Sequence, residues 1–231
     1  MTELLERAPL YRSEPLDELD GIPVFAVRDD YQRNYEKIAA DHLRWMSKGV
    51  LNPWQKTEGM LVLEGATASF VRYLTNPGSR VLDVGVATGR VLALLPEWDR
   101  HGCDIARNYL KVARGLGINV CVARAENLPY ADGYFDAVIA TDILEHVLDP
   151  NAAVSEMMRV LRSDGFLIVR VPREDDLSPY LNAEYRFVHL RKFDLPTLEL
   201  LLTRIFHTEI LLQTDVVASG GNEILIGARK L

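Results

Sequence analysis

The chain has 231 residues, 48% of them hydrophobic, which is enough to bury a full α/β core. Its net charge of -7 argues against a nucleic-acid partner, because phosphate binding is driven by clusters of Lys and Arg. No apolar run approaches the roughly 20 residues of a membrane span. The first residues also lack the basic segment followed by an apolar segment that is typical of a signal peptide. We therefore expect a cytoplasmic protein that contacts neither nucleic acid nor membrane, with Cys103 and Cys121 reduced in its core.

The first third of the chain divides into an arm and a helical cap. Residues 1–29 are rich in charge and proline, and we expect an irregular arm wrapped on the surface. Residues 30–76 carry apolar side chains at spacings of three and four, which is typical of amphipathic helices. Gly49 is a candidate stop for the first helix, and Asn52-Pro53 opens the second. Three aromatic residues of this cap fit either the core or a pocket lining: Tyr31, Tyr35 and Trp54.

From residue 77 onward, short apolar strands alternate with helices, which is the pattern of a parallel α/β sheet. We expect strands at residues 80–83, 100–104, 119–123, 135–141 and 166–171, with a helix after each of the first four. The alternation lapses in an insertion at residues 173–193, and a helix at 194–205 follows. Two late strands, 207–216 and 222–229, are separated by a glycine-containing loop and predict a terminal hairpin.

The strongest functional signal is the turn that follows the first of these strands, Asp83-Val84-Gly85-Val86-Ala87-Thr88-Gly89. Its small residues, Gly85, Ala87 and Gly89, let a cofactor approach the main-chain N–H groups, and a helix begins just beyond them. A dinucleotide-binding turn also carries spaced glycines, but the third glycine of that fingerprint is missing here. A nicotinamide-type site and a turn without a ligand stay open as alternatives.

A second acid ends the next predicted strand. Asp104 lies about 20 residues after Gly85, which places its carboxylate at the neighbouring strand tip, where it can bind both hydroxyls of a ribose. An aspartate at this point also caps the helix that follows. The two roles are compatible.

The glycine-containing turn resembles motif I of the class I S-adenosylmethionine-dependent methyltransferases, with Ala87 in place of the usual middle glycine. Residues 123–130, 135–147 and 161–169 are similar, in order, to the third, fourth and fifth motif regions of the same superfamily. The resemblance covers residues 77–172 and is to type 11 members. It implies a Rossmann-like, doubly wound, seven-stranded sheet, mostly parallel with an antiparallel C-terminal hairpin, to which the N-terminal helices are added.

The same resemblance implies S-adenosylmethionine as cofactor, bound by a domain of residues 77–231 with a substrate-side insertion at 173–193. The cofactor-binding residues that it assigns are Asp83, Gly85, Ala87, Gly89, Asp104, Ile105, Ala125, Glu126 and Thr141. Many relatives carry an aspartate where this chain has Arg124, so Glu126 or a backbone carbonyl has to accept from the adenine amino group.

Methyl transfer to a hydroxyl requires alignment of the reactants and removal of a proton, for which histidine has the most suitable pKa. The catalytic candidates are His189, in the insertion, and His146, at the start of the helix expected after the fourth strand; we favour His189 as the base. Asp142, Glu145 and His146 share one face of such a helix, as metal ligands would. Because capping explains the two acids equally well, no metal is assigned.

The sequence thus predicts a methyltransferase that acts on oxygen or nitrogen of a small molecule, such as a sugar-linked, secondary or quinone-type metabolite. The alternative is a binding module that keeps the cofactor without turnover, which Ala87 and Arg124 favour because each changes a usual cofactor contact. Basic residues of the insertion fit either a substrate-facing surface or a solvated loop: Arg186, His189, Arg191 and Lys192. The sequence does not identify the methyl acceptor. A homodimer remains one possible oligomeric state.

Overall fold

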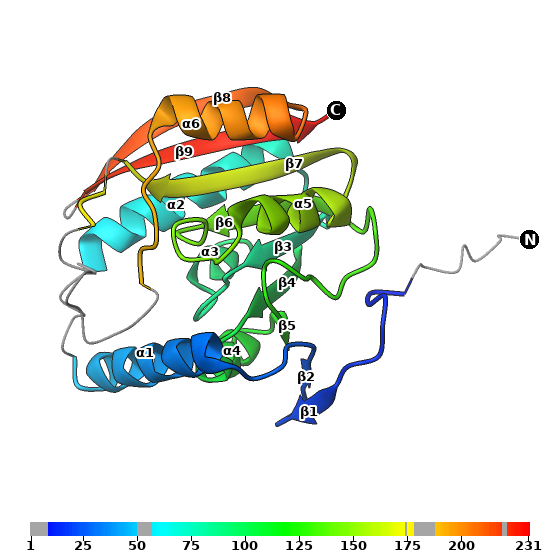
Figure 1. Cartoon of the computed structure of the whole chain (residues 1–231), viewed down its shortest axis with the longest axis vertical. Helices are drawn as coiled ribbons and strands as arrows, with labels where there is room; N and C mark the ends of the chain where they lie inside the picture. The colour runs from blue at the N-terminus through cyan, green and yellow to red at the C-terminus, as the bar shows by residue number, and fades with distance from the viewer. Residues whose placement is uncertain (1–8, 50–56, 174, 178–187, 219–220) are drawn as a thin grey trace, which may run out of the picture.

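The computed structural model describes residues 9–49, 57–173, 175–177, 188–218 and 221–231. Within them, nine strands form a sheet in the order β1-β2-β5-β4-β3-β6-β7-β9-β8 (Figure 1). The five central strands are parallel: β3 (Arg80–Val84), β4 (Asp99–Asp104), β5 (Asn119–Val122), β6 (Phe135–Thr141) and β7 (Leu161–Pro172). Their residues are mostly buried, as expected for strands covered on both faces.

The predicted C-terminal hairpin is confirmed. It consists of β8 (Thr208–Ala218) and β9 (Gly221–Lys230), and β9 pairs antiparallel with both β8 and β7. The doubly wound, mostly parallel sheet with an antiparallel hairpin is therefore the fold that the sequence predicts.

The sheet has nine strands instead of the expected seven, because part of the expected irregular arm is a hairpin. Its strands are β1 (Asp17–Leu19) and β2 (Ile22–Val24), and Val24 pairs with Val122 at the end of β5. Asp20 and Gly21 form the turn, with φ angles of 55° and 72°. Asp-Gly between two strands is a known signal for a hairpin, so the pair Asp20-Gly21 could have predicted this one.

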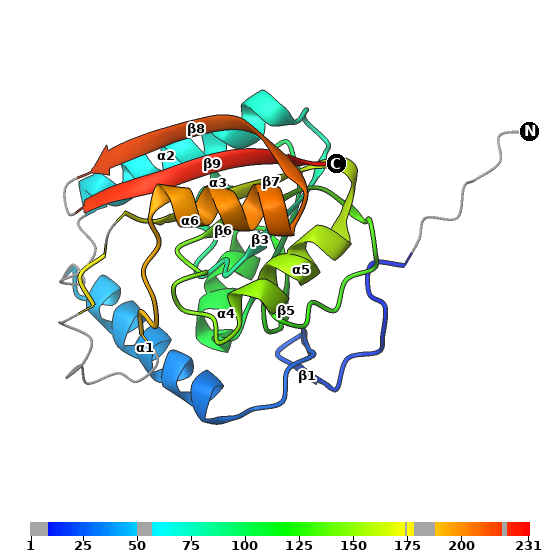
Figure 2. The ribbon, with the colours of Figure 1, turned by 45° about the horizontal axis from the view of Figure 1, so that its top comes forward.

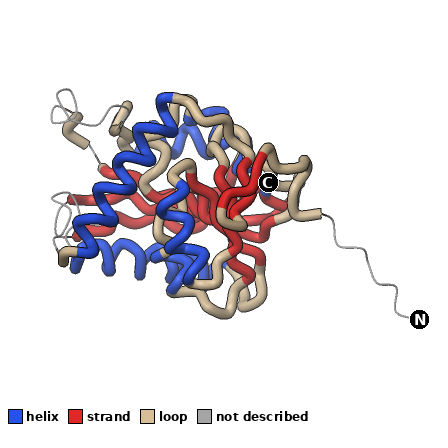
Figure 3. The backbone as a smooth tube through the Cα atoms, turned by 90° about the horizontal axis from the view of Figure 1, so that it is seen from below, coloured by secondary structure: helices blue, strands red, loops and turns tan. Residues whose placement is uncertain are grey.

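Helices cover both faces of the sheet, as seen in Figures 2 and 3. One face packs against α2 (Thr57–Leu74), α3 (Arg90–Ala93) and α4 (Arg107–Gly115). The other packs against α5 (Pro150–Val160) and α6 (Leu195–Leu200), which a π-helical turn, Leu201–Ile205, extends. Among the described residues, no helix is both long and apolar enough to cross a membrane. Cys103 and Cys121 are free and buried, as predicted.

The first helix of the predicted cap, α1 (Asp30–Ser47), packs against α4 (Figure 1). Asp29 caps it by accepting a hydrogen bond from the backbone N–H of Gln32, and Gly49 follows its end with a φ of 65°, as the sequence predicts. Trp54 and the pair Asn52-Pro53 lie outside the described residues.

One predicted helix is absent from the described chain, and another begins later than predicted. Residues 123–134 between β5 and β6 form a loop, and residues 142–149 after β6 form turns, so that His146 does not begin a helix. The helix begins later because Asp149 accepts hydrogen bonds from the N–H groups of Asn151 and Ala152, and Pro150 occupies the first helical turn.

Candidate active site

The carboxyl ends of β3, β4 and β6 meet at one edge of the sheet, because these parallel strands are neighbours. This brings together the predicted cofactor residues that follow them, including Gly85, Asp104 and Thr141. Helix α1 lies beside this edge, where the side-chain amide of Gln32 donates to the carbonyl of Ile105 over 3.0 Å. The cofactor edge, as we name these strand ends, is therefore bounded by the N-terminal cap.

Three N–H groups of the turn are already bonded inside the protein. Those of Gly85 and Val86 both donate to the carbonyl of Cys103, at 2.8 and 3.0 Å. That of Ala87 donates to one carboxylate oxygen of Asp104 over 3.0 Å, and that of Ala106 donates to the other over 2.8 Å. Asp104 thus ties the turn to Ala106, the residue before α4, while the helix itself has no side-chain cap, so the capping alternative is not confirmed.

The two glycines of the turn are required by conformation and packing. Gly85 has a φ of 80°, and a Cβ there would lie 2.9 Å from Cδ1 of Ile143. Gly89 has a φ of 82°, and a Cβ there would lie 2.5 Å from Cδ1 of Ile118, in the core and not in a ligand site. Ala87 also adopts a left-handed backbone, with a φ of 44°. Packing accounts for the glycine at position 89, and its role in admitting a cofactor stays a prediction.

Buried acid groups at the cofactor edge fit a ligand that carries positive charge. Asp83 is 3% exposed, and its Oδ1 has no hydrogen-bond partner among the described residues. Burial raises its pKa to about 8, and burial also raises the pKa of Asp104 to about 6. S-adenosylmethionine carries an ammonium and a sulfonium group, and a cation at this edge stabilises the ionised carboxylates.

The loop expected at the adenine is tied to the rest of the protein. Oε1 of Glu126 accepts from the backbone N–H of Leu148 over 2.9 Å, so one carboxylate oxygen of this predicted adenine contact is already engaged. Ala125 is buried beside it. Arg124 pairs with Asp29, and its guanidinium lies 4.8 Å from the ring centroid of Tyr31. Arg124 therefore anchors the start of α1.

The structure brings the two predicted catalytic histidines together. The ring centroids of His146 and His189 are 4.6 Å apart, with the rings nearly perpendicular. Backbone contacts hold the two segments in place: the N–H of Leu190 donates to the carbonyl of Glu145 over 2.8 Å, and Arg191 donates to the carbonyl of Leu144 over 2.8 Å. Of the predicted basic cluster, Arg191 is thus structural, and Arg186 lies outside the described residues.

Each histidine has an oriented ring. Nδ1 of His146 lies 3.0 Å from the hydroxyl of Tyr35, and Tyr31 donates to the His146 carbonyl over 3.0 Å. Burial, with His189 and Arg191 adding, lowers the pKa of His146 to about 3, so this ring is neutral. Nδ1 of His189 bonds the carboxylate of Asp175. Asp175 was missed, because no local pattern in the insertion singles out one acid.

The three residues considered as metal ligands from the sequence do not converge. Asp142 forms an ion pair with the buried Arg170 instead, since residues 142–149 are turns and not one helical face. Glu145, His146 and His189 do converge, and their potential ligand atoms lie within 4.8 Å of one another.

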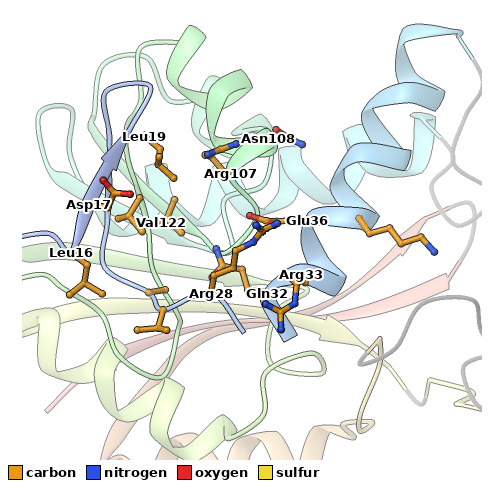
Figure 4. Close-up of a pocket in the computed structure, with 14 residues that line it drawn as sticks. Leu16, Asp17, Leu19, Arg28, Gln32, Arg33, Glu36, Arg107, Asn108 and Val122 are labelled. Atoms are coloured by element: carbon orange, nitrogen blue, oxygen red, sulfur yellow. The ribbon is translucent and has the colours of Figure 1, made fainter. Parts of the chain in front are cut away.

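A separate cavity of about 620 Å³ lies between the β1–β2 hairpin, α1 and the start of α4. Figure 4 shows Asp17 and Leu19 at its hairpin side and Arg107 and Asn108 at its α4 side. Gln32, which bonds Ile105, also lines it, but none of the predicted site residues does. The cavity therefore adjoins the cofactor edge without forming it.

Residues 82–169 match the family model of the methyltransferase domain. Over 107 residues the chain is 36% identical to a tRNA (carboxymethyluridine(34)-5-O)-methyltransferase of Arabidopsis thaliana. This match covers 45% of this chain and 26% of that protein. Over 124 residues it is 33% identical to a ubiquinone/menaquinone biosynthesis C-methyltransferase of Desulfotalea psychrophila, covering 48% of this chain and 50% of that protein. The matches thus span a quarter to a half of these relatives.

The fold is also similar to a solved structure. A Burkholderia thailandensis 1,6-didemethyltoxoflavin-N1-methyltransferase with bound S-adenosylhomocysteine has a TM-score of 0.64 and 20% identity, covering 89% of this chain and 92% of that one. With the motif turn, the acid at the tip of β4 and the sheet order, these similarities agree on one family. Residues 82–169 form a methyltransferase domain of the S-adenosylmethionine-dependent kind, and S-adenosylmethionine is its cofactor.

Proposed function

We propose that this protein transfers the methyl group of S-adenosylmethionine to an oxygen or nitrogen atom of a small molecule. The observation that carries the proposal is the position of the two histidines. Tyr31, Gln32 and Tyr35 are close together on α1, where Gln32 contacts Ile105 of the cofactor edge and Tyr35 contacts His146. Helix α1 therefore links the histidine pair to the cofactor edge, which supports a methyl acceptor bound beside the two histidines.

When bound, S-adenosylmethionine supplies an electrophilic methyl group on a sulfonium. The remaining requirements fall to the residues of this chain. Asp104 holds the ribose hydroxyls, and Asp83 supplies negative charge near the cationic end of the cofactor. The aromatic rings of Tyr31 and Tyr35 exclude water beside the acceptor. His146 and His189 are the catalytic residues. They assist removal of the acceptor proton and align the acceptor atom with the methyl carbon.

A small molecule is favoured as acceptor over RNA by charge. The chain carries a net charge of -7, and RNA binding needs exposed basic clusters. One basic residue of the insertion, Arg191, is committed to the carbonyls of Leu144 and Val147. Some relatives are named for tRNA and others for quinone biosynthesis, so both acceptor classes belong in the test.

The experiment is methyl transfer from S-adenosylmethionine labelled in its methyl group. Phenols, amines, sugar-linked metabolites and bulk tRNA are offered as acceptors, and the labelled products are identified by mass spectrometry. The expected result is label on oxygen or nitrogen of a small molecule. Label in tRNA alone, or on carbon, contradicts the proposal.

The second candidate function is a module that binds the cofactor without turnover. It is favoured by Arg124, which pairs with Asp29 and leaves no acid at the usual position for the adenine amino group. Calorimetric binding of S-adenosylmethionine, with no labelled product from any acceptor class, would support this candidate over the first.

A further inference from the structure

Glu145, His146 and His189, here named the Glu-His-His cluster, gather three potential ligand atoms within 4.8 Å of one another. They come from the turns after β6 and from the segment before α6. Nε2 of His146 lies 3.8 Å from Oε1 of Glu145. Two imidazoles and one carboxylate form a ligand set that suits divalent transition metals and leaves coordination positions open.

The carboxylate of this cluster lacks any partner that would explain its burial. Glu145 is 1% exposed, and neither of its carboxylate oxygens has a hydrogen-bond partner among the described residues. A buried carboxylate without partners is costly. The buried guanidinium of Arg170 is already bonded to Asp142 and, over 3.1 Å, to the hydroxyl of Thr67. A cation held by Glu145 would supply the missing partner.

Each imidazole has one ring nitrogen bonded to a neighbouring polar group, as is usual for histidines that bind a metal. Nδ1 of His146 is bonded to the hydroxyl of Tyr35 at 3.0 Å, and Nδ1 of His189 is bonded to the carboxylate of Asp175. A histidine that binds metal through one ring nitrogen almost always bonds its other nitrogen to a neighbouring polar group, which fixes the tautomer and the ring plane. The two contacts therefore orient the rings of both histidines at once.

We propose that Glu145, His146 and His189 bind one divalent transition-metal ion, with Tyr35 and Asp175 as positioning residues for the two imidazoles. The catalytic consequence rests on the proposed function: at an open position the ion binds the acceptor hydroxyl and makes it more acidic. The hydroxyl proton passes to water, an oxygen electron pair forms the bond to the methyl carbon, and the carbon–sulfur bond breaks with its electrons left on sulfur. His146 and His189 thus assist proton removal by holding the ion that activates the acceptor.

The test uses the full, untagged chain, stripped with a chelator and titrated with Co²⁺ as a spectroscopic probe. We expect one Co²⁺ per chain, a visible ligand-field spectrum of nitrogen and oxygen ligands, and displacement by Zn²⁺. Glu145→Gln and His189→Ala should each weaken binding at least tenfold, and Asp175→Asn should weaken it about 10- to 100-fold, as for other residues that orient a metal ligand. His42→Ala is the matched control, because His42 bonds Tyr109 outside the cluster and should leave binding unchanged.

Two results would overturn the site: no stoichiometric Co²⁺ binding by the folded protein, or equal binding by Glu145→Gln, His189→Ala and the original chain. Thermal unfolding of each variant establishes that it is folded. Full methyl transfer by the stripped protein, in the presence of chelator, would overturn the catalytic role of the ion. That result would leave the proposed methyl transfer intact, whereas failure of the proposed function appears separately, as an absence of labelled product with the metal bound.

Discussion

At the scale of single residues, the cofactor edge concentrates buried charge. Asp83 has no hydrogen-bond partner for one oxygen, and its pKa is raised to about 8 from an ordinary value of 3.8. Because the folded state binds this proton more tightly, its stabilising contribution is fully present below pH 3.8 and is lost as the pH rises toward 8. The groups that face Asp83 are Arg170, Asp104, Asp142 and Glu64.

Asp83→Asn mimics the protonated acid, so its free energy of unfolding should fall less between pH 5 and pH 8 than that of the original chain. Urea unfolding at several pH values measures the slope of the free energy of unfolding against pH for both proteins. Some slope remains in the variant, because burial also raises the pKa values of Glu64 and Asp104. Identical slopes for the two proteins would contradict the raised pKa of Asp83.

The unusual alanine of the motif turn makes a second prediction. Ala87 has a φ of 44°, a conformation that costs an L-residue about 1 to 2 kcal/mol, whereas glycine adopts it freely. Glycine gains entropy in the unfolded chain, so Ala87→Gly should raise the free energy of unfolding by a net of about 0.5 kcal/mol. Thermal unfolding tests this, with Gly85→Ala as the opposite case: it should destabilise, since its Cβ would lie 2.9 Å from Ile143. A destabilised Ala87→Gly variant would show that the alanine is favoured for another reason.

The two histidines proposed as catalytic give a third prediction at this scale. His189→Ala should lower turnover by about 10²- to 10⁴-fold, the usual contribution of a group that assists proton removal, and leave S-adenosylmethionine affinity intact. Product formation and calorimetry are measured on the same preparation. Normal turnover by a folded His189→Ala variant would remove this residue from the catalytic machinery.

At the scale of elements, the N-terminal hairpin extends the sheet through a single tight turn. Gly21 has a φ of 72°, and a Cβ there would lie 2.7 Å from Nη1 of Arg114. Gly21→Ala should therefore destabilise the hairpin by about 1 kcal/mol, the scale of the left-handed penalty. Hydrogen exchange is the measurement: the N–H of Phe25, bonded to the Val122 carbonyl, should lose protection, while the N–H groups of β6 keep theirs. Equal protection of Phe25 in both proteins would contradict this.

Elements that follow a strong periodic pattern were predicted from the sequence, and those decided by a single residue were not. The five parallel strands and the terminal hairpin follow from alternating apolar runs. The β1–β2 hairpin was missed because its strands have three residues each and Pro23 interrupts the second. The helix expected to begin near Asp142 starts only at Pro150, where Asp149 supplies the cap.

The site divides in the same way. Positions next to the motif turn could be assigned from sequence, because the ends of parallel strands must meet. His146 and His189 were also identified, and the structure places them in contact. The contacts of Tyr35 and Asp175 could not be predicted, since they join segments far apart in the chain and no local pattern encodes them.

At the scale of the whole molecule, the two functions of the site belong to different parts of the chain. The cofactor edge is built by the sheet, whereas the acceptor side combines α1, the turns after β6 and the end of the insertion. Such a division allows related folds to keep one cofactor and change acceptors, because the sheet holds its geometry while the covering segments vary. Under the proposed function, residues outside the sheet therefore determine the acceptor.

The most direct test of the account is a calorimetric titration with S-adenosylmethionine of the original chain and of Asp104→Ala. The variant should bind more weakly by roughly 1.5 to 3 kcal/mol, the range for hydrogen bonds to a charged group. Asp99→Ala, at the opposite end of the same strand, is the control and should bind as the original chain does. Equal affinity in a folded Asp104→Ala variant, or no binding by the original chain, would contradict the cofactor site on which the proposed methyl transfer depends.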